Sequence, residues 1–113
     1  MYKYYLRPGY GTLKLLIEFF HGTESNSFIS DLFAAISELK PEIIDFSELW
    51  MNDETLLSIS TEMGEFMITK DIWGFVFIMA EDNQECILKI NSILESTEHF
   101  EKEEVDFEKY KLK

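Results

Sequence analysis

The chain has little of three things: cysteine, basic residues and long apolar runs. Its 113 residues include one cysteine, Cys86, so no disulfide can form within the chain, and a reducing compartment is the easier home. The longest apolar run, residues 72–80, is far shorter than the ~20 residues that a membrane-spanning helix requires. No basic and apolar leader precedes the Pro-Gly pair at 8–9. We therefore expect a soluble, cytoplasmic protein.

Basic residues are scarce, with 10 Lys and Arg against 22 Asp and Glu and a net charge of −12. No lysine or arginine occurs between Lys40 and Lys70. Nucleic acids and anionic membranes bind to basic surfaces, so this composition argues against both as direct partners. It favours simple solubility or a basic partner.

Apolar residues are nevertheless plentiful, at 46% of the chain with 15% aromatic. A disordered acidic chain would combine its charge with low hydrophobicity, and this one does not. A chain of this length buries roughly two thirds of its unfolded surface. The composition therefore predicts a single folded domain over residues 1–113.

The spacing of apolar residues changes along the chain. In some segments every second residue is apolar, and in others apolar residues recur once per helical turn. In order, this spacing predicts a hairpin over 2–20 with its turn at 8–11, a helix over 28–39, a hairpin over 57–68, a central strand over 71–80, a helix over 82–96 and an edge strand from residue 100. The last segment also fits helical spacing. Residues 42–54 show no clean period, and Ser47 there could cap one helical turn.

These elements predict an α+β fold in the order ββ-α-βββ-α-β. Because the strands come in hairpins, the sheet should be mostly antiparallel, with the two amphipathic helices packed on one face. The helical stripe of residues 28–39 and the apolar run of residues 75–79 are expected to form the core.

Catalytic and metal-binding patterns are sparse. His21 and His99 have no neighbouring His or Cys at ligand spacing, and Cys86 lies beside an apolar helical stripe that predicts an inert, buried thiol. The Pro-Gly-Tyr-Gly turn lacks the lysine and the following helix of a phosphate-binding loop. We therefore expect no enzyme activity, no cofactor and no metal.

Acidic residues concentrate in two segments. Between residues 41 and 69 lie Glu42, Asp45, Glu48, Asp53, Glu54, Glu62 and Glu65, without any base. Between residues 101 and 108 lie Glu101, Glu103, Glu104, Asp106 and Glu108, with one lysine. If both segments lie on one side of the molecule, they create a strongly negative field that captures cationic partners. Trp50, within the first segment, is either a core residue or the anchor of an interface.

The stretches "IEFFHGTESNSF" (17–28), "ELWMNDE" (48–54), "GEFMITKDIW" (64–73) and "FEKEEVDFEKY" (100–110) give the chain a resemblance to a known class. It resembles the small acidic immunity proteins of bacterial contact-dependent growth inhibition systems. The resemblance covers about a third of the chain and implies a non-catalytic cytosolic protein. Such proteins bind and neutralise a cognate toxin domain, often a nuclease acting on tRNA or DNA, as a 1:1 complex.

The resemblance and the charge together predict how such a toxin is blocked. Carboxylates would pair with the basic cleft of the toxin around Trp50. The predicted contact residues of the first patch are Asp45, Glu48, Trp50, Asp53 and Glu54, and those of a second patch are Glu101, Glu103, Glu104 and Asp106.

Two other classes of function remain open from the sequence. A small ligand-binding domain or enzyme would use an aromatic pocket with His21 at its mouth; its lining residues would be Tyr2, Tyr4, Tyr5, Tyr10, Phe19 and Phe20. A regulatory module would instead bind another protein through an exposed edge of the sheet. Salt distinguishes these classes, because only carboxylate-steered association slows steeply as ionic strength rises.

Overall fold

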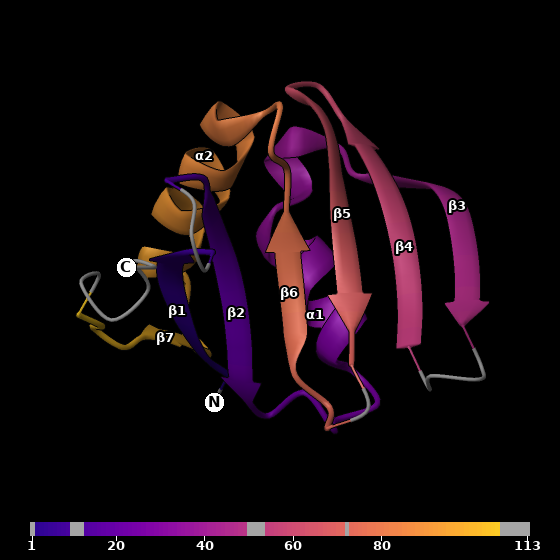
Figure 1. The fold of residues 1–113 in the computed structure, drawn as a ribbon. Helices are drawn as coiled ribbons and strands as arrows, with labels where there is room; N and C mark the ends of the chain where they lie inside the picture. Colours follow the sequence, from indigo (N-terminus) through magenta and orange to yellow (C-terminus); the bar gives the residue numbers. More distant parts are fainter. Residues whose placement is uncertain (1, 10–12, 50–53, 72, 107–113) are drawn as a thin grey trace.

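The computed structural model describes residues 2–9, 13–49, 54–71 and 73–106, which form one seven-stranded sheet and two α-helices (Figure 1). In chain order the elements are β1 (Tyr2–Pro8), β2 (Leu15–His21), α1 (Phe28–Ala35), the 3-10 turn η1 (Ser37–Leu39), β3 (Glu42–Leu49), β4 (Glu54–Thr61), β5 (Gly64–Lys70), β6 (Val76–Met79), α2 (Gln84–Glu95) and β7 (Phe100–Lys102). The predicted α+β class is confirmed. In the described part of the chain, no helix has the length and hydropathy needed to cross a membrane.

The sheet is mostly antiparallel, as predicted, with the strand order β3-β4-β5-β6-β2-β1-β7. Only the pairing of β1 with β7 is parallel. After α1 the chain crosses to the far edge of the sheet and returns strand by strand until β6 pairs with β2 (Figure 1). This path leaves β3 at one edge of the sheet and β7 at the other.

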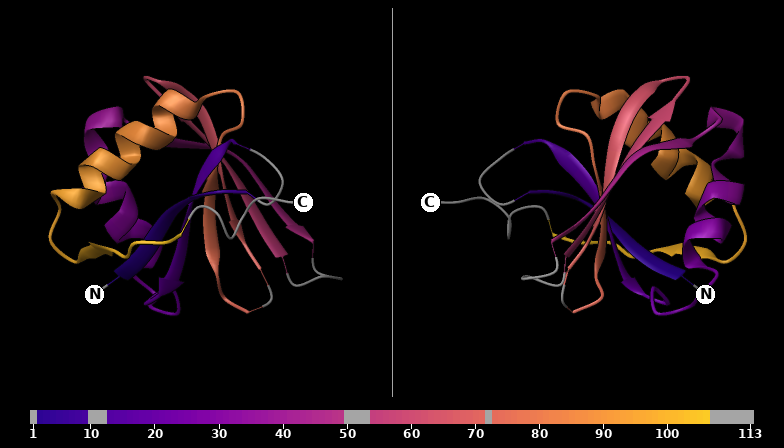
Figure 2. Two further views of the ribbon diagram at one scale, coloured as in Figure 1. Left: turned by 60° about the vertical axis from the view of Figure 1, so that its left-hand side comes forward. Right: turned by 90° about the vertical axis from the view of Figure 1, so that its right-hand side faces the viewer.

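Both helices lie on the same face of the sheet, which we call the helix face (Figure 2). Side chains alternate between the two faces along a strand. Ile17, Ile68 and Ile78 are paired across neighbouring strands and are buried on the helix face. Their chain neighbours Met67 and Met79 therefore point to the opposite, helix-free face.

The predicted strand order is wrong in one respect: residues 42–49, expected to be irregular, form β3. The order is therefore ββ-α-ββββ-α-β, and Ser47 lies in a strand and caps no helical turn. The physical reason is a bulge. Ile43 pairs with Ile59 and Asp45 with Ser58, which leaves Ile44 as an extra residue. The bulge shifts the phase of the side-chain alternation, so no clean period of two survives in the sequence.

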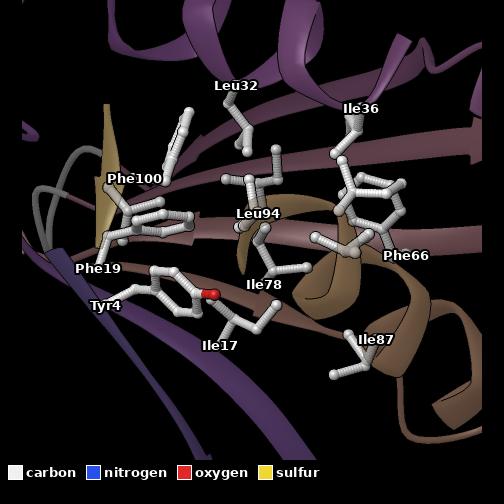
Figure 3. Packing of buried hydrophobic residues seen from close by; sticks show 14 of the residues in the cluster. Tyr4, Ile17, Phe19, Leu32, Ile36, Phe66, Ile78, Ile87, Leu94 and Phe100 are labelled. Carbon is white, nitrogen blue, oxygen red and sulfur yellow. The ribbon is translucent and has the colours of Figure 1, made fainter. Parts of the chain in front are cut away.

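The core lies between the helix face of the sheet and the two helices (Figure 3). Fully buried side chains come from β1, β2, β4 and β6 and from both helices; they include Tyr4, Ile17, Phe19, Leu32, Ile36, Ile59, Ile78, Ile87, Ile90 and Leu94. Phe28 and Leu32 of α1 and Val76 and Ile78 of β6 belong to this cluster. The core prediction is confirmed for these residues. It is wrong for Phe75, which is 37% exposed, and for Phe77 and Met79, which alternate with Val76 and Ile78 and face the other side of the sheet.

A chain of polar contacts joins α2 to the two strands at the β7 edge. The Tyr4 hydroxyl donates to Asn91 Oδ1 at 3.2 Å, and Asn91 Nδ2 donates to Glu95 Oε1 at 2.9 Å. Lys102 Nζ of β7 reaches the same carboxylate oxygen at 2.9 Å. These hydrogen bonds from Lys102 and Asn91 lower the pKa of the Glu95 carboxyl. The network satisfies the buried polar groups of Tyr4 and Asn91.

Candidate partner-binding surface

Strand β3 forms an exposed edge of the sheet. In the described part of the chain it pairs only with β4, so its other side presents unpaired backbone N–H and C=O groups. Three large apolar side chains on it are unusually open: Ile43 and Ile44 are each 52% exposed and Phe46 is 55% exposed. Natural edge strands are normally short or protected by charge. A long edge strand with three exposed apolar residues is typical of a surface that a partner covers.

The bulge in β3 distributes these side chains in a defined way. Ile43 and Phe46 share the helix face with their partners Ile59 and Leu57, although they are three residues apart. Asp45 faces the helix-free side and is exposed. Neither helix lies behind β3 in Figure 1, and Ile43 and Phe46 remain more than half exposed. We call the group Ile43, Ile44, Asp45 and Phe46 the β3 edge surface.

A cavity of about 330 Å³ adjoins the β3 edge surface on the helix face. Phe46 and Leu57 form its wall towards β3, and the buried Phe28 and Val76 lie at its apolar base. The other lining residues are Ile29, Ile68, Lys70 and the polar residues Thr23, Ser25, Asn26 and Thr55. Its volume is at the lower end of the range for ligand pockets and suits one large side chain.

The structure places part of the first predicted patch on this edge. Asp45 is an exposed residue of β3. Glu48 on β3 and Glu54 on β4 lie at the same end of this strand pair, in the register Glu48–Thr55 and Leu49–Glu54; their side chains are not among those that the structure describes. Trp50 and Asp53 lie outside the described residues. Whether Trp50 is core or anchor therefore stays a prediction.

The second predicted patch lies at the opposite edge of the sheet. Glu101 belongs to β7, and Glu103, Glu104 and Asp106 follow it. Six strand-to-strand steps of ~4.8 Å place β7 roughly 29 Å from β3. Glu103 also lies 3.8 Å from Lys3 Nζ. The two acidic segments therefore do not form one continuous face.

The sequence did not indicate Ile43, Ile44 and Phe46 as binding residues. Residues 42–54 show no clean period, and large apolar side chains are normally buried. The exposure of these three residues follows from the strand order, which places β3 at the edge of the sheet with a partner strand on one side only. One feature of the sequence could have indicated these residues: three large apolar side chains lie within residues 41–69, a segment with acids and no base.

The aromatic residues of the alternative pocket do not meet in one place. Tyr2, Tyr4 and Phe19 are buried in the core on the helix face. Tyr5 and Phe20 stack on each other, with ring centroids 4.3 Å apart, on the helix-free face. Tyr10 lies outside the described residues. The sheet separates the other five, so they cannot line a common cavity, and the pocket prediction is wrong.

On the helix-free face, Arg7 of β1 and Glu18 of β2 form a largely buried ion pair. Arg7 Nε donates to Glu18 Oε1 at 2.6 Å, and the guanidinium carbon lies 5.8 Å from the centre of the Phe77 ring. Their side chains are 9% and 15% exposed. Removing either partner of a pair this well enclosed would leave the other charge buried without compensation, which is strongly destabilising.

Residues considered for chemistry are isolated in the described part of the chain. His21 is exposed at the end of β2, and His99 is exposed with a positive φ of 77°. No three His, Cys, Asp or Glu residues cluster there as metal ligands. Cys86 is fully buried near the start of α2, and burial raises the pKa of its thiol. The expectation of a buried thiol is confirmed.

The Cys86 thiol is expected to resist alkylation and Ellman's reagent at about pH 8, where a free thiol with a pKa of about 8.5 reacts readily. Its raised pKa reduces the thiolate fraction, and its burial blocks access. Labelling should become complete when denaturant unfolds the protein. Rapid stoichiometric labelling of the native protein would contradict this assignment.

Comparison of the chain with protein-family models, with curated proteins and with solved structures finds no significant match.

Proposed function

We propose that this chain is a non-catalytic immunity protein that binds and neutralises a basic toxin domain. The observation that carries the proposal is the β3 edge surface: exposed apolar side chains on a free strand edge, within a segment that has no base from residue 41 to 69. Apolar anchors ringed by carboxylates suit a partner that is basic around an apolar centre.

The proposed mechanism is steric and electrostatic blockade. The carboxylates of Asp45, Glu48, Asp53 and Glu54 would speed the encounter and pair with lysines and arginines of the toxin. Trp50 and the exposed β3 residues would supply the apolar contact. A nuclease is the favoured target, because its phosphate-binding cleft is basic and accepts carboxylates in place of phosphate.

The distribution of acids refines this proposal. Because Glu101 and its neighbours lie at the opposite edge, the β3 edge is the primary contact and the β7 edge contributes mainly long-range attraction. The inhibitor would act in the cytosol as a monomer in a 1:1 complex, since a charge of −12 opposes self-association.

A second candidate function is a regulatory module that pairs its free edge with a strand of another protein. The eight-residue length of β3 favours it, because a strand of this length offers several backbone hydrogen bonds to an added strand. Such pairing needs no basic partner and depends little on salt.

The test is co-expression with the toxin-like domain encoded beside this gene. We expect a 1:1 complex, rescue of growth, and an association rate that falls at least about tenfold between ~50 and ~500 mM NaCl. The rate of dissociation should change far less. A complex whose association ignores salt would favour the regulatory module, and the absence of both complex and rescue would reject the immunity function.

A further inference from the structure

The helix-free face carries a second hollow, at the end of the sheet where β4 turns into β5 and β6 leads into α2. It measures about 670 Å³. Three of its lining residues are methionines, Met63, Met67 and Met79, and three are acids, Glu65, Glu81 and Asp82. We call it the methionine groove. The proposal of an immunity protein makes no use of it.

The floor of the groove is formed by side chains that the pairing of β5 with β6 brings together. Met67 of β5 pairs with Met79 of β6, so the two thioethers lie side by side on the helix-free face. Met67 is 40% exposed, which is high for a residue in the middle of a sheet. Methionine is flexible and polarisable, and proteins use it where an apolar surface must adapt to the side chain of a partner.

The rim of the groove is uniformly acidic. The side chains of Glu65, Glu81 and Asp82 are exposed, and none makes an ion pair or a side-chain hydrogen bond within the described part of the chain. Other acids of this protein, such as Glu18 and Glu62, do have basic partners. No basic residue lines the groove among the described residues. Free carboxylates around an apolar floor complement an apolar side chain flanked by cations.

The two walls of the groove are held together by Asn83. Its Nδ2 donates to the carbonyl oxygens of Met63 at 2.9 Å and Glu65 at 3.2 Å, which fastens the β6–α2 loop to the β4–β5 turn. Gly64 makes this contact possible, because a Cβ there would lie 2.9 Å from Asn83 Nδ2. Its φ of +105° also favours glycine. The groove is thus a preformed site.

We propose that the methionine groove is a docking site for a protein segment that presents a large apolar side chain between lysines or arginines. Charge complementarity decides against a second copy of this chain, whose net charge is −12. The groove also continues towards the β3 edge: Asp45, Ser58, Met67 and Met79 form one row across four paired strands on the helix-free face. One basic partner could therefore span both surfaces.

The test uses the full chain with isotope-labelled methionine and isoleucine methyl groups, titrated with a synthetic Lys/Leu/Phe peptide of net charge about +5. We expect saturable shifts of the Met63, Met67 and Met79 methyl signals, whether or not the Ile43 and Ile44 signals of the β3 edge surface also shift. A peptide with serine in place of its apolar residues, and one with glutamate in place of lysine, should not shift them. Because no toxin is used, the result is independent of the immunity function.

Matched variants locate the site. Neutralising the rim with E65Q, E81Q and D82N should lower the affinity for the peptide about tenfold at low salt and much less at ~500 mM NaCl. The control variant E24Q, E38Q and E98Q removes the same charge elsewhere and should change affinity less than about twofold. M67Q should weaken binding about tenfold, whereas L88Q, at another exposed apolar residue, should not.

Several results would overturn the proposal. If the methionine methyl signals shift as the protein concentration is raised in the absence of peptide, the occupant of the groove is a second copy of this chain. If the methionine methyl signals shift when residues 109–113 are deleted, the occupant of the groove is this chain's own basic segment, whose sequence is KYKLK. Unchanged methionine signals, equal weakening by the control variants, or peptide shifts confined to Ile43 and Ile44 would show that the groove does not bind such segments.

Discussion

Replacing Phe19 with alanine is expected to lower the free energy of unfolding by about 3–5 kcal/mol. Phe19 of β2 is fully buried. Its ring centre lies 5.7 Å from that of Tyr4, 5.0 Å from that of Phe28 and 6.1 Å from that of Phe100. These rings come from β1, α1 and β7, so the truncation leaves a cavity where a helix and three strands meet.

The neighbouring Phe20 provides a matched control. It has the same side chain and strand but points to the helix-free face, where it is half-buried and stacks on Tyr5. Phe20→Ala should cost only about 1 kcal/mol, from the lost stacking and partial burial. Urea unfolding of both variants, compared at equal m-value, measures the difference. Similar losses for the two would mean that the assignment of faces along β2 is wrong.

Phe19 and Phe20 differ because side chains alternate between the two faces of a strand. The same alternation made most of the fold predictable from the sequence. Along β2 the period of two holds from Leu15 to Phe19, before the register shift near its end, and in α2 Ile87, Ile90 and Leu94 follow one helical stripe. Local periodicity of this kind is set by the sequence itself. It is confirmed in both hairpins and both helices.

Strand β3 escaped prediction because its signal is not local. The bulge at Ile44 breaks the alternation, and the position of the strand at the sheet edge is set by pairing with β4. Both depend on the tertiary structure, which overrides a pattern only eight residues long.

The candidate binding surface was likewise predictable only where its signal lies in the local sequence. The absence of bases around Asp45 is a property of the sequence, and Asp45 is exposed in the structure. The separation of Asp45 from Glu101 was not predictable, because strand order places them at opposite edges. The methionine groove likewise joins residues from β4 to the start of α2 that only the register brings together.

Changing Asp45 to lysine together with Phe46 to alanine is expected to weaken binding of the basic toxin domain by at least about 100-fold, or about 2.7 kcal/mol. The first change places a cation against the cationic partner, and the second removes an apolar anchor. Both side chains are exposed, with Phe46 at 55%, so the stability of the free protein should change by less than about 1 kcal/mol. Calorimetric titration and growth rescue measure the loss of binding, and urea unfolding checks stability.

The opposite edge of the sheet supplies the control, which also decides between the two acidic segments. Glu101→Lys with Leu88→Ala makes the same kind of change on β7 and α2, and Leu88 is 48% exposed. Because Glu101 lies on β7, roughly 29 Å from β3, and Leu88 lies on a helix instead of the β3 edge, this pair should alter affinity less than about tenfold and act mainly on the association rate. A larger loss for the control than for the β3 variant would move the contact to β7. Since main-chain pairing at a strand edge tolerates exposed side-chain changes, full rescue by the β3 variant would instead show that the side chains of Asp45 and Phe46 do not carry the contact.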